Sequence, residues 1–196
     1  MNQTQYWNAE WTKRRREILV PTMNRNKLAK VVYELSIREY LDKLNKLDIG
    51  CGTGIHAMHL SAFHIGWKTF YTGIDLSERA VDFGKSYGFN LICDDFFKYD
   101  FGCKFDCFLM LDSLEHFMNH DMLIKKILEL ANPKALMIVN VPLYCQRTAH
   151  DTGMERPISP DDILYFYKGL GVTESFGSDI YGSYGFPYMF AEGELP

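Results

Sequence analysis

The sequence contains no apolar run that approaches the roughly 18 residues of a membrane-spanning helix. Its first residues, Met1-Asn2-Gln3, carry no signal-peptide pattern. Internal repeats and low-complexity segments are also missing from its 196 residues, and this length suits one well-buried core better than two domains. We therefore expect a single domain in the cytoplasm, with no membrane partner.

Clustered positive charge is scarce as well. Lys and Arg together number 21 against 25 Asp and Glu, which gives a formal net charge of −4. A phosphate footprint needs clustered Lys and Arg, so this balance argues against broad affinity for nucleic acid. The one basic cluster, residues 13–16, is short, and we interpret it as a solvated helix face.

The five cysteines include no second pair that would complete a zinc site. Cys103 and Cys107 straddle the start of a predicted strand, which places their side chains in different settings. Cys51 and Cys93 stand at strand ends in apolar runs, and we predict buried thiols there. The cysteines therefore indicate no metal site.

Three glycines on alternate positions are the most informative feature that is present. Gly50, Gly52 and Gly54 follow a short apolar run that starts at Leu47. The pattern predicts a strand that turns sharply into a helix and leaves bare backbone where a small ligand can approach. Asp75 ends a second apolar run, 25 residues beyond Gly50. A carboxylate at the tip of a second strand can accept hydrogen bonds from both hydroxyls of a ribose.

A dinucleotide-binding loop would carry a third glycine at the position of Ile55. With Asp48 just before it, the loop suits a cationic ligand better than a pyrophosphate. The chain here resembles the class I S-adenosylmethionine-dependent methyltransferases, from about Leu47 to the C-terminus. The resemblance implies S-adenosylmethionine as cofactor and S-adenosylhomocysteine as product, with the glycine loop on the methionine moiety and Asp75 on the ribose.

Further motifs follow in the order of this family. Residues 90–95 indicate a third strand that ends in two carboxylates, and residues 105–111 a fourth. By register, the resemblance implies that Asp94, or else its neighbour Asp95, accepts a hydrogen bond from the adenine amino group, with Phe96 on the ring. The predicted cofactor contacts are Asp48, Gly50, Cys51, Gly52, Gly54, Asp75, Leu76, Asp94, Asp95, Phe96 and Leu111.

Predicted strands alternate with helices until the end of the chain. This alternation is typical of an α/β fold with a doubly wound, seven-stranded, mostly parallel sheet, the Rossmann-like methyltransferase fold. Residues 1–45 are expected to form an N-terminal helical cap of the same domain, and residues 46–196 the cofactor domain. Within the cap, Asn24 or Asn26 is predicted to begin a helix that runs to about Leu44.

The C-terminal third is predicted in less detail. Residues 135–141 indicate a buried fifth strand that Pro142 stops, followed by a loop over residues 143–158. Ser159 is a predicted N-cap for a helix through about Lys168, and residues 172–180 and 186–191 are predicted to form an antiparallel hairpin.

The sulfonium donor is already activated, so side chains have mainly to position the nucleophile and remove its proton. His116 is our candidate general base. It lies in the segment Asp112 to Phe117, which is similar to the Leu-Glu-His segment of many small-molecule methyltransferases. Alternatively, Glu115 and His116 cap the next helix or brace the cofactor loop, and an amine or an anionic acceptor needs no base.

Two missing patterns narrow the substrate. The tip of the fourth strand lacks Asn-Pro-Pro-Tyr or Asp-Pro-Pro-Tyr, which would indicate amide or base nitrogens, and the paired Asp-Asn of metal-dependent catechol enzymes is absent. No metal is our expectation. However, Asp112, Glu115, His116 and His150 resemble, with Asp replacing Glu, the metal-binding set of enzymes that methylate the 3′ end of small RNA. A metal-assisted RNA methyltransferase is therefore one alternative.

The predicted function is methyl transfer to an oxygen or nitrogen atom of a small-molecule metabolite. Predicted substrate contacts come from the N-terminal helices and from the loop after the fifth strand: Tyr6, Trp7, Trp11, Tyr144 and His150. The three N-terminal aromatics alternatively hold the first helix against the domain. A non-catalytic cofactor-binding subunit is the second alternative function. The sequence leaves the accepting atom open and allows a monomer or a homodimer.

Overall fold

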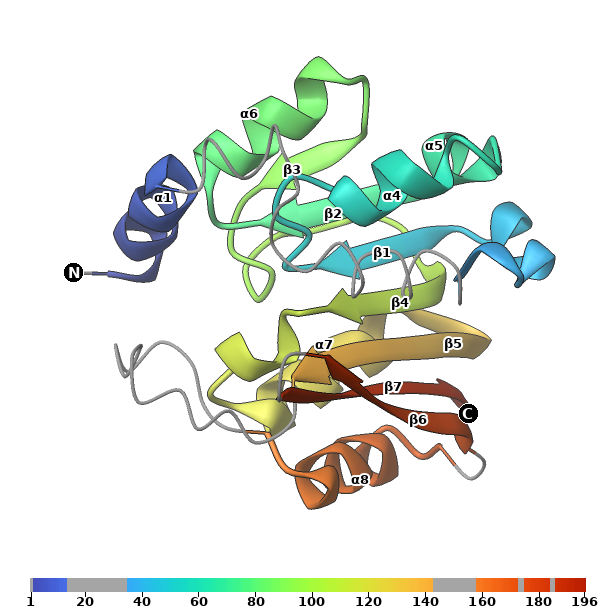
Figure 1. Ribbon diagram of the computed structural model, residues 1–196. Helices are drawn as coiled ribbons and strands as arrows, with labels where there is room; N and C mark the ends of the chain where they lie inside the picture. Colours follow the sequence, from blue (N-terminus) through green and yellow to red (C-terminus); the bar gives the residue numbers. More distant parts are fainter. Residues whose placement is uncertain (1, 14–34, 143–157, 173–174, 184–185) are drawn as a thin grey trace. The chain divides into compact units, whose positions relative to one another are not determined.

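The computed structural model describes residues 2–13, 35–142, 158–172, 175–183 and 186–196 (Figure 1). They group into two compact units, residues 1–99 and residues 100–196. The predicted boundary between residues 45 and 46 falls inside the first unit. No helix in these ranges is long and apolar enough to cross a membrane.

Three parallel strands form the sheet of the first unit, in the order β3-β2-β1. They are β1 (Lys46–Ile49), β2 (Tyr71–Asp75) and β3 (Leu91–Cys93). Every residue of β1 is buried, as expected of a parallel strand covered on both faces. The third strand is shorter than the predicted residues 90–95. The prediction of two buried thiols is correct for Cys51 and wrong for Cys93, which is exposed because it is the last residue of this short strand.

The strands of the first unit are connected by helices α4 (Ile55–Leu60), α5 (Gly66–Thr69) and α6 (Glu78–Ser86). The N-terminal helix α1 (Gln3–Lys13) lies beside α6 (Figure 1). Helix α6 lies close to the glycine loop. A Cβ atom added to Gly84 would lie only 2.5 Å from the carbonyl oxygen of Thr53.

The predicted helix that runs to about Leu44 is wrong at its end, because the helical residues 35 and 36 are followed by a turn at Ile37. Residues 14–34 lie outside the described ranges. Tyr40 and Leu41 belong to a short 3-10 helix, η1 (Glu39–Lys43), and Leu44 follows in extended conformation. The fully buried Lys46 donates from Nζ to the carbonyl oxygens of Leu41 and Leu44, each at 2.7 Å, so it satisfies the end of η1 where β1 begins.

The second unit contains a mixed sheet in the order β4-β5-β7-β6. Strand β4 (Phe105–Leu111) pairs in parallel with β5 (Ala131–Pro142), and β5 pairs antiparallel with β7 (Phe186–Glu194). Strand β6 (Ser175–Ser183) pairs antiparallel with β7, which confirms the predicted hairpin. Cys103 is exposed and Cys107 is buried, so their side chains do occupy different settings.

The fifth strand differs from its prediction at both ends. It begins at Ala131, four residues early, because the chain enters the ladder through an irregular stretch in which Lys134 has φ 64° and the register shifts. Asn132 Nδ2 donates to Asp106 Oδ1 at 2.7 Å and holds this stretch on β4. The predicted strand ends at residue 141, before Pro142. In the structure Pro142 is the last residue of β5 and pairs with Tyr188.

Two helices of the second unit begin at clear caps. Asn119 accepts from Met122 N at the start of α7 (His120–Leu130). Ser159 and Asp162 form a reciprocal capping box at α8 (Pro160–Gly169), which confirms the predicted cap. The two helices pack against each other.

Gly84→Ala tests the close approach of α6 to the glycine loop. The added methyl group would meet a backbone carbonyl, and such overpacking costs about 1 to 3 kcal/mol. Ala gains about 1 kcal/mol over Gly in a helix. Because a backbone carbonyl cannot move aside as a flexible side chain can, the upper half of the overpacking range applies, and we expect a net loss of about 1 to 2 kcal/mol in the free energy of unfolding, measured by urea denaturation. Lys85→Ala, an exposed change on the same helix, is the control and should stay near wild type. A Gly84→Ala protein as stable as wild type would contradict the close approach.

Candidate functional site

The glycine loop turns between β1 and α4 with three glycines in the left-handed region. Gly50, Gly52 and Gly54 have φ values of 73°, 55° and 69°. Residues that carry a side chain rarely adopt this backbone conformation, so the turn requires glycine at these three positions. Gly50 N and Cys51 N both donate to the carbonyl oxygen of Ile74, which ties the start of the loop to β2.

Asp75 joins the loop to the end of β2. Gly52 N donates to Asp75 Oδ2 at 2.8 Å, and Ser77 N donates to Asp75 Oδ1 at 2.8 Å. Burial raises the pKa of Asp75, and these two N–H donors oppose that effect. Each carboxylate oxygen has a second lone pair, so Asp75 keeps the capacity to accept hydrogen bonds from two ligand hydroxyls.

Helix α1 covers this part of the loop. Ser77 Oγ accepts from Ala80 N at the start of α6 and donates to Asn8 Oδ1 at 2.9 Å. A Cβ on Gly52 would lie 2.6 Å from Trp11 Cζ2, so the indole ring lies directly on the loop. Asn8 was missed by the sequence reasoning. Its spacing of three from Trp11, which places both on one helical face, is the signal that indicates it.

The other two aromatics of α1 contact each other. The rings of Tyr6 and Trp7 meet edge to face with centroids 4.9 Å apart, and Tyr6 is buried. Tyr144 and His150 lie outside the described residues. Substrate contact by these five side chains stays a prediction.

Asp48 lies in the interior beneath the loop. Its Oδ2 accepts from the Tyr71 hydroxyl at 2.7 Å, and within the described ranges its Oδ1 has no hydrogen-bond partner. Burial raises the pKa of Asp48 to about 7; the nearby Asp75 acts in the same direction, and the hydrogen bond from Tyr71 opposes both. The protein therefore holds one buried carboxylate, Asp48, and one half-buried carboxylate, Asp75, next to three left-handed glycines.

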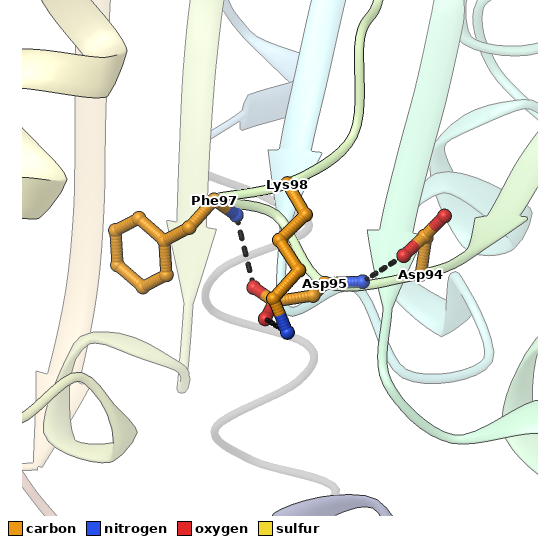
Figure 2. A network of polar contacts seen from close by, with 4 residues as sticks. All are labelled: Asp94, Asp95, Phe97 and Lys98. Carbon is orange, nitrogen blue, oxygen red and sulfur yellow. Dashed lines mark hydrogen bonds and ion pairs between the residues drawn. The ribbon is translucent and has the colours of Figure 1, made fainter.

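The two carboxylates after β3 differ in their local bonds (Figure 2). Asp95 Oδ1 accepts from Phe97 N at 3.0 Å, and Asp95 Oδ2 lies 3.0 Å from Lys98 Nζ. Asp94 is exposed and accepts from Asp95 N at 2.7 Å. Asp95 is thus held in its own turn, whereas Asp94 is the carboxylate with capacity for a ligand. Phe96 is buried and meets Phe97 edge to face.

Leu76 is half-buried between Asp75 and Ser77, and its contact with the cofactor stays a prediction. The other remaining predicted residues belong to the second unit. Leu111 ends β4 and is buried, and the next residue, Asp112, has φ 59°, an uncommon value for a residue with a side chain. Glu115 is buried and His116 half-buried in the short 3-10 helix η2 (Leu114–His116). Over the described part of the chain, no three His, Cys, Asp or Glu side chains gather as a metal site. The metal alternative also requires His150, so it stays a prediction.

A family model described as a methyltransferase domain matches residues 11–168 of the sequence. The chain belongs to this methyltransferase family. The match covers the glycine loop, Asp75, the carboxylates after β3 and the segment that contains His116, and it confirms the resemblance seen in the sequence. A comparison with curated proteins gives no significant match.

Several solved structures share the fold of this methyltransferase domain. Magnesium protoporphyrin IX methyltransferase from Synechocystis is 17% identical with a TM-score of 0.74, and the match covers 98% of this chain and 97% of that one. An N-methyltransferase from Bradyrhizobium japonicum is 16% identical with a TM-score of 0.66, over 89% of this chain and 99% of that one. The cyclase SpnF is 17% identical with a TM-score of 0.70, over 85% and 80%.

These similarities confirm the predicted fold class, a Rossmann-like α/β fold with a mostly parallel sheet. In the described residues of the methyltransferase domain, the first unit supplies three parallel strands and the second supplies four in a mixed arrangement.

Asp48 should make the stability of the free protein depend on pH. Its usual pKa is 3.8 and its pKa in the folded protein is about 7, so the folded state holds the proton to higher pH than the unfolded chain does. Folded-state stability is then lost as pH rises from about 4 through about 7, by roughly 4 kcal/mol at about 1.36 kcal/mol per unit. Asp48→Asn has no such proton to lose. We expect the stability difference, variant minus wild type, to move in favour of the variant across this window in urea denaturation at pH 5 to 8.5.

Asp82→Asn, an exposed change on α6, is the matched control and should give a curve parallel to that of wild type. If the Asp48→Asn curve is parallel as well, the buried carboxylate does not titrate in this window and its assigned pKa is wrong.

Proposed function

We propose that the protein is an S-adenosylmethionine-dependent methyltransferase that methylates an oxygen or nitrogen atom of a small molecule. The hydrogen bond from Gly52 N to Asp75 Oδ2, 2.8 Å long, carries this proposal. It holds the Asp75 carboxylate against the bare backbone of the glycine loop, which supports binding of a nucleoside joined to a small cationic group, with Asp75 on the ribose.

The residues present fit this cofactor. Asp75 would hold the ribose hydroxyls, and the exposed Asp94 would accept from the adenine amino group, because Asp95 already bonds Phe97 N and Lys98. The buried Asp48, with its unpartnered Oδ1 among the described side chains, favours a positive ligand near the loop. A side chain at Gly52 would collide with Trp11, so the loop has no room beyond bare backbone there.

When bound, the cofactor supplies a methyl group activated by the sulfonium. A lone pair of the acceptor forms the new bond to the methyl carbon while the carbon–sulfur bond breaks, and its electrons stay on sulfur as a neutral thioether. His116 would take the proton that a hydroxyl or protonated amine loses, and its imidazole suits this role near neutral pH. Trp11 and Asn8, which hold α1 on the loop, would keep water away from the cofactor.

The small-molecule class is supported by the structures that share the fold, which include methyltransferases named for a magnesium porphyrin and for N-methylation. The cyclase SpnF shares the fold as well. Fold alone therefore does not fix the reaction, and methyl transfer has to be measured directly. Two alternative functions have separate tests. A gel shift with RNA tests for an RNA methyltransferase, and a stable copurifying partner would indicate a non-catalytic subunit.

Asp75→Ala tests the cofactor site. Loss of two charge-assisted hydrogen bonds to the ribose is expected to weaken S-adenosylmethionine binding by about 2 to 3 kcal/mol, roughly 30- to 150-fold in dissociation constant. Titration calorimetry measures the change, with Asp75→Asn as the variant that keeps the size of the side chain and Asp82→Asn as the exposed control. Unchanged affinity in Asp75→Ala would remove Asp75 from the site. Wild-type protein that binds NAD and not S-adenosylmethionine would overturn the proposed function.

His116→Ala separates a general base from a structural role. A base is expected to contribute about 10² to 10⁴ in turnover, so the variant should lose that rate and the rate inflection on the acid side of neutrality while binding S-adenosylhomocysteine normally. Transfer of a labelled methyl group to a panel of small acceptors provides the rates. His59→Ala, an exposed histidine on α4, is the control. A His116→Ala protein with a lowered melting temperature and weak cofactor binding would show that His116 braces the structure.

A further inference from the structure

The carboxylate of Asp48 lies directly beneath the end of the glycine loop. Tyr71 Oη donates to Asp48 Oδ2 at 2.7 Å, and a Cβ on Gly54 would lie 3.6 Å from the same hydroxyl oxygen. Asp48 is 2% exposed, and no described residue forms a hydrogen bond with its Oδ1. The Asp48–Tyr71 pair therefore lies against the loop that we assign to the cofactor, with one buried oxygen left over.

Two ionisable groups of β2, Tyr71 and Asp75, act on the pKa of Asp48, and the thiol of Cys51 in the loop lies close enough to be influenced by it. Tyr71 and Cys51 are buried, and burial raises the pKa of each well above its usual range, so both stay neutral near pH 7. Asp75 carries the only other carboxylate in this set, and it adds to the cost of a charge on Asp48. In the described ranges, neither Asp48 nor Asp75 forms an ion pair with Lys or Arg. A negative charge on Asp48 therefore has no paired cation among the residues that the structure describes.

The two ligands of a methyl transfer differ by one charge. The donor carries a positive sulfonium, the product carries a neutral thioether, and the rest of the two molecules is the same. A positive charge close to Asp48 stabilises its charged form, whereas a neutral sulfur does not. A sulfonium bound within about 6 to 10 Å of Asp48 would, at an effective dielectric constant near 20, change the affinity by roughly 15- to 100-fold.

We propose that Asp48 distinguishes the cofactor from its product by charge. It releases its proton to solvent when the sulfonium binds, and it takes a proton back when only the thioether remains in the site. The preference for cofactor over product then rises with pH, and product leaves more readily after each transfer. This inference rests on the proposed function, which identifies the two ligands, and it assigns to Asp48 a role in specificity that ribose or adenine contacts cannot supply.

Titration calorimetry with S-adenosylmethionine and S-adenosylhomocysteine at pH 6, 7 and 8 tests the proposal. For the wild-type protein, the ratio of the product dissociation constant to the cofactor dissociation constant is expected to rise roughly fivefold or more from pH 6 to pH 8. The sulfonium lowers the pKa of the α-amino group in the cofactor relative to the product, so each free ligand is titrated separately and its contribution is removed from the ratio. Repeating the titrations in buffers of different ionisation enthalpy counts the protons released with each ligand, and more should be released with the cofactor.

Three variants sharpen the test. Asp48→Asn should give a ratio that does not change with pH. Tyr71→Phe removes the hydrogen bond that favours the charged carboxylate, so the rise should move to higher pH, and this variant serves if Asp48→Asn folds poorly. Asp82→Asn, the exposed control, should behave as wild type.

The outcomes are distinguishable. A wild-type ratio that is constant with pH, or an Asp48→Asn protein that keeps the pH dependence, overturns this inference and leaves the proposed function intact. Wild-type protein that binds neither ligand overturns the proposed function, and the inference falls with it.

Discussion

The carboxylate of Asp75 accepts hydrogen bonds from the N–H groups of Gly52 and Ser77, and the first unit is organised around these two bonds. One bond fixes the glycine loop to the end of β2. The other holds Ser77 at the position where it caps α6 and bonds Asn8 of α1. A single side chain therefore links the loop, the strand end and two helices. The same carboxylate keeps lone pairs for a ligand, so the bonds that hold the loop together also prepare it to bind one.

Charge gives the site its second property. Asp48 is buried and Asp75 half-buried near the loop, and no Lys or Arg in the described ranges forms an ion pair with either. Such an arrangement disfavours an anionic pyrophosphate and favours a cation, in agreement with the missing third glycine at Ile55. The carboxylates after β3 form a contrast, because they lie near the surface and Asp95 is paired with Lys98 (Figure 2). In the described residues, the carboxylates next to the glycine loop therefore lack the ion pair that Asp95 has.

The sequence predicts the loop and its carboxylate closely, because both are encoded locally. Alternate glycines demand left-handed turns, and Gly50, Gly52 and Gly54 all adopt them. The Ser159 cap and the final hairpin could be predicted for the same reason.

Features that depend on tertiary contact could not be predicted. The bond between Ser77 and Asn8 joins residues 69 apart in the chain, and the spacing of Asn8 from Trp11 does not identify Ser77 as the partner. The early start of β5 depends on the left-handed Lys134 and on the bond from Asn132 to Asp106, and Cys93 is exposed because β3 ends there.

The central claim is that S-adenosylmethionine binds on the glycine loop and on Asp75. The most direct test follows the backbone amide signals of Gly52 and Ser77 in the isotope-labelled wild-type protein by NMR while the ligand is added. Both amides donate to the Asp75 carboxylate, so their signals should shift together and saturate with S-adenosylmethionine, with the amides of Asp94 and Asp95 shifting at the same ligand concentration and NAD causing no change. Signals of Gly52 and Ser77 that stay fixed while S-adenosylmethionine saturates another part of the protein, or that respond to NAD instead, would contradict the account.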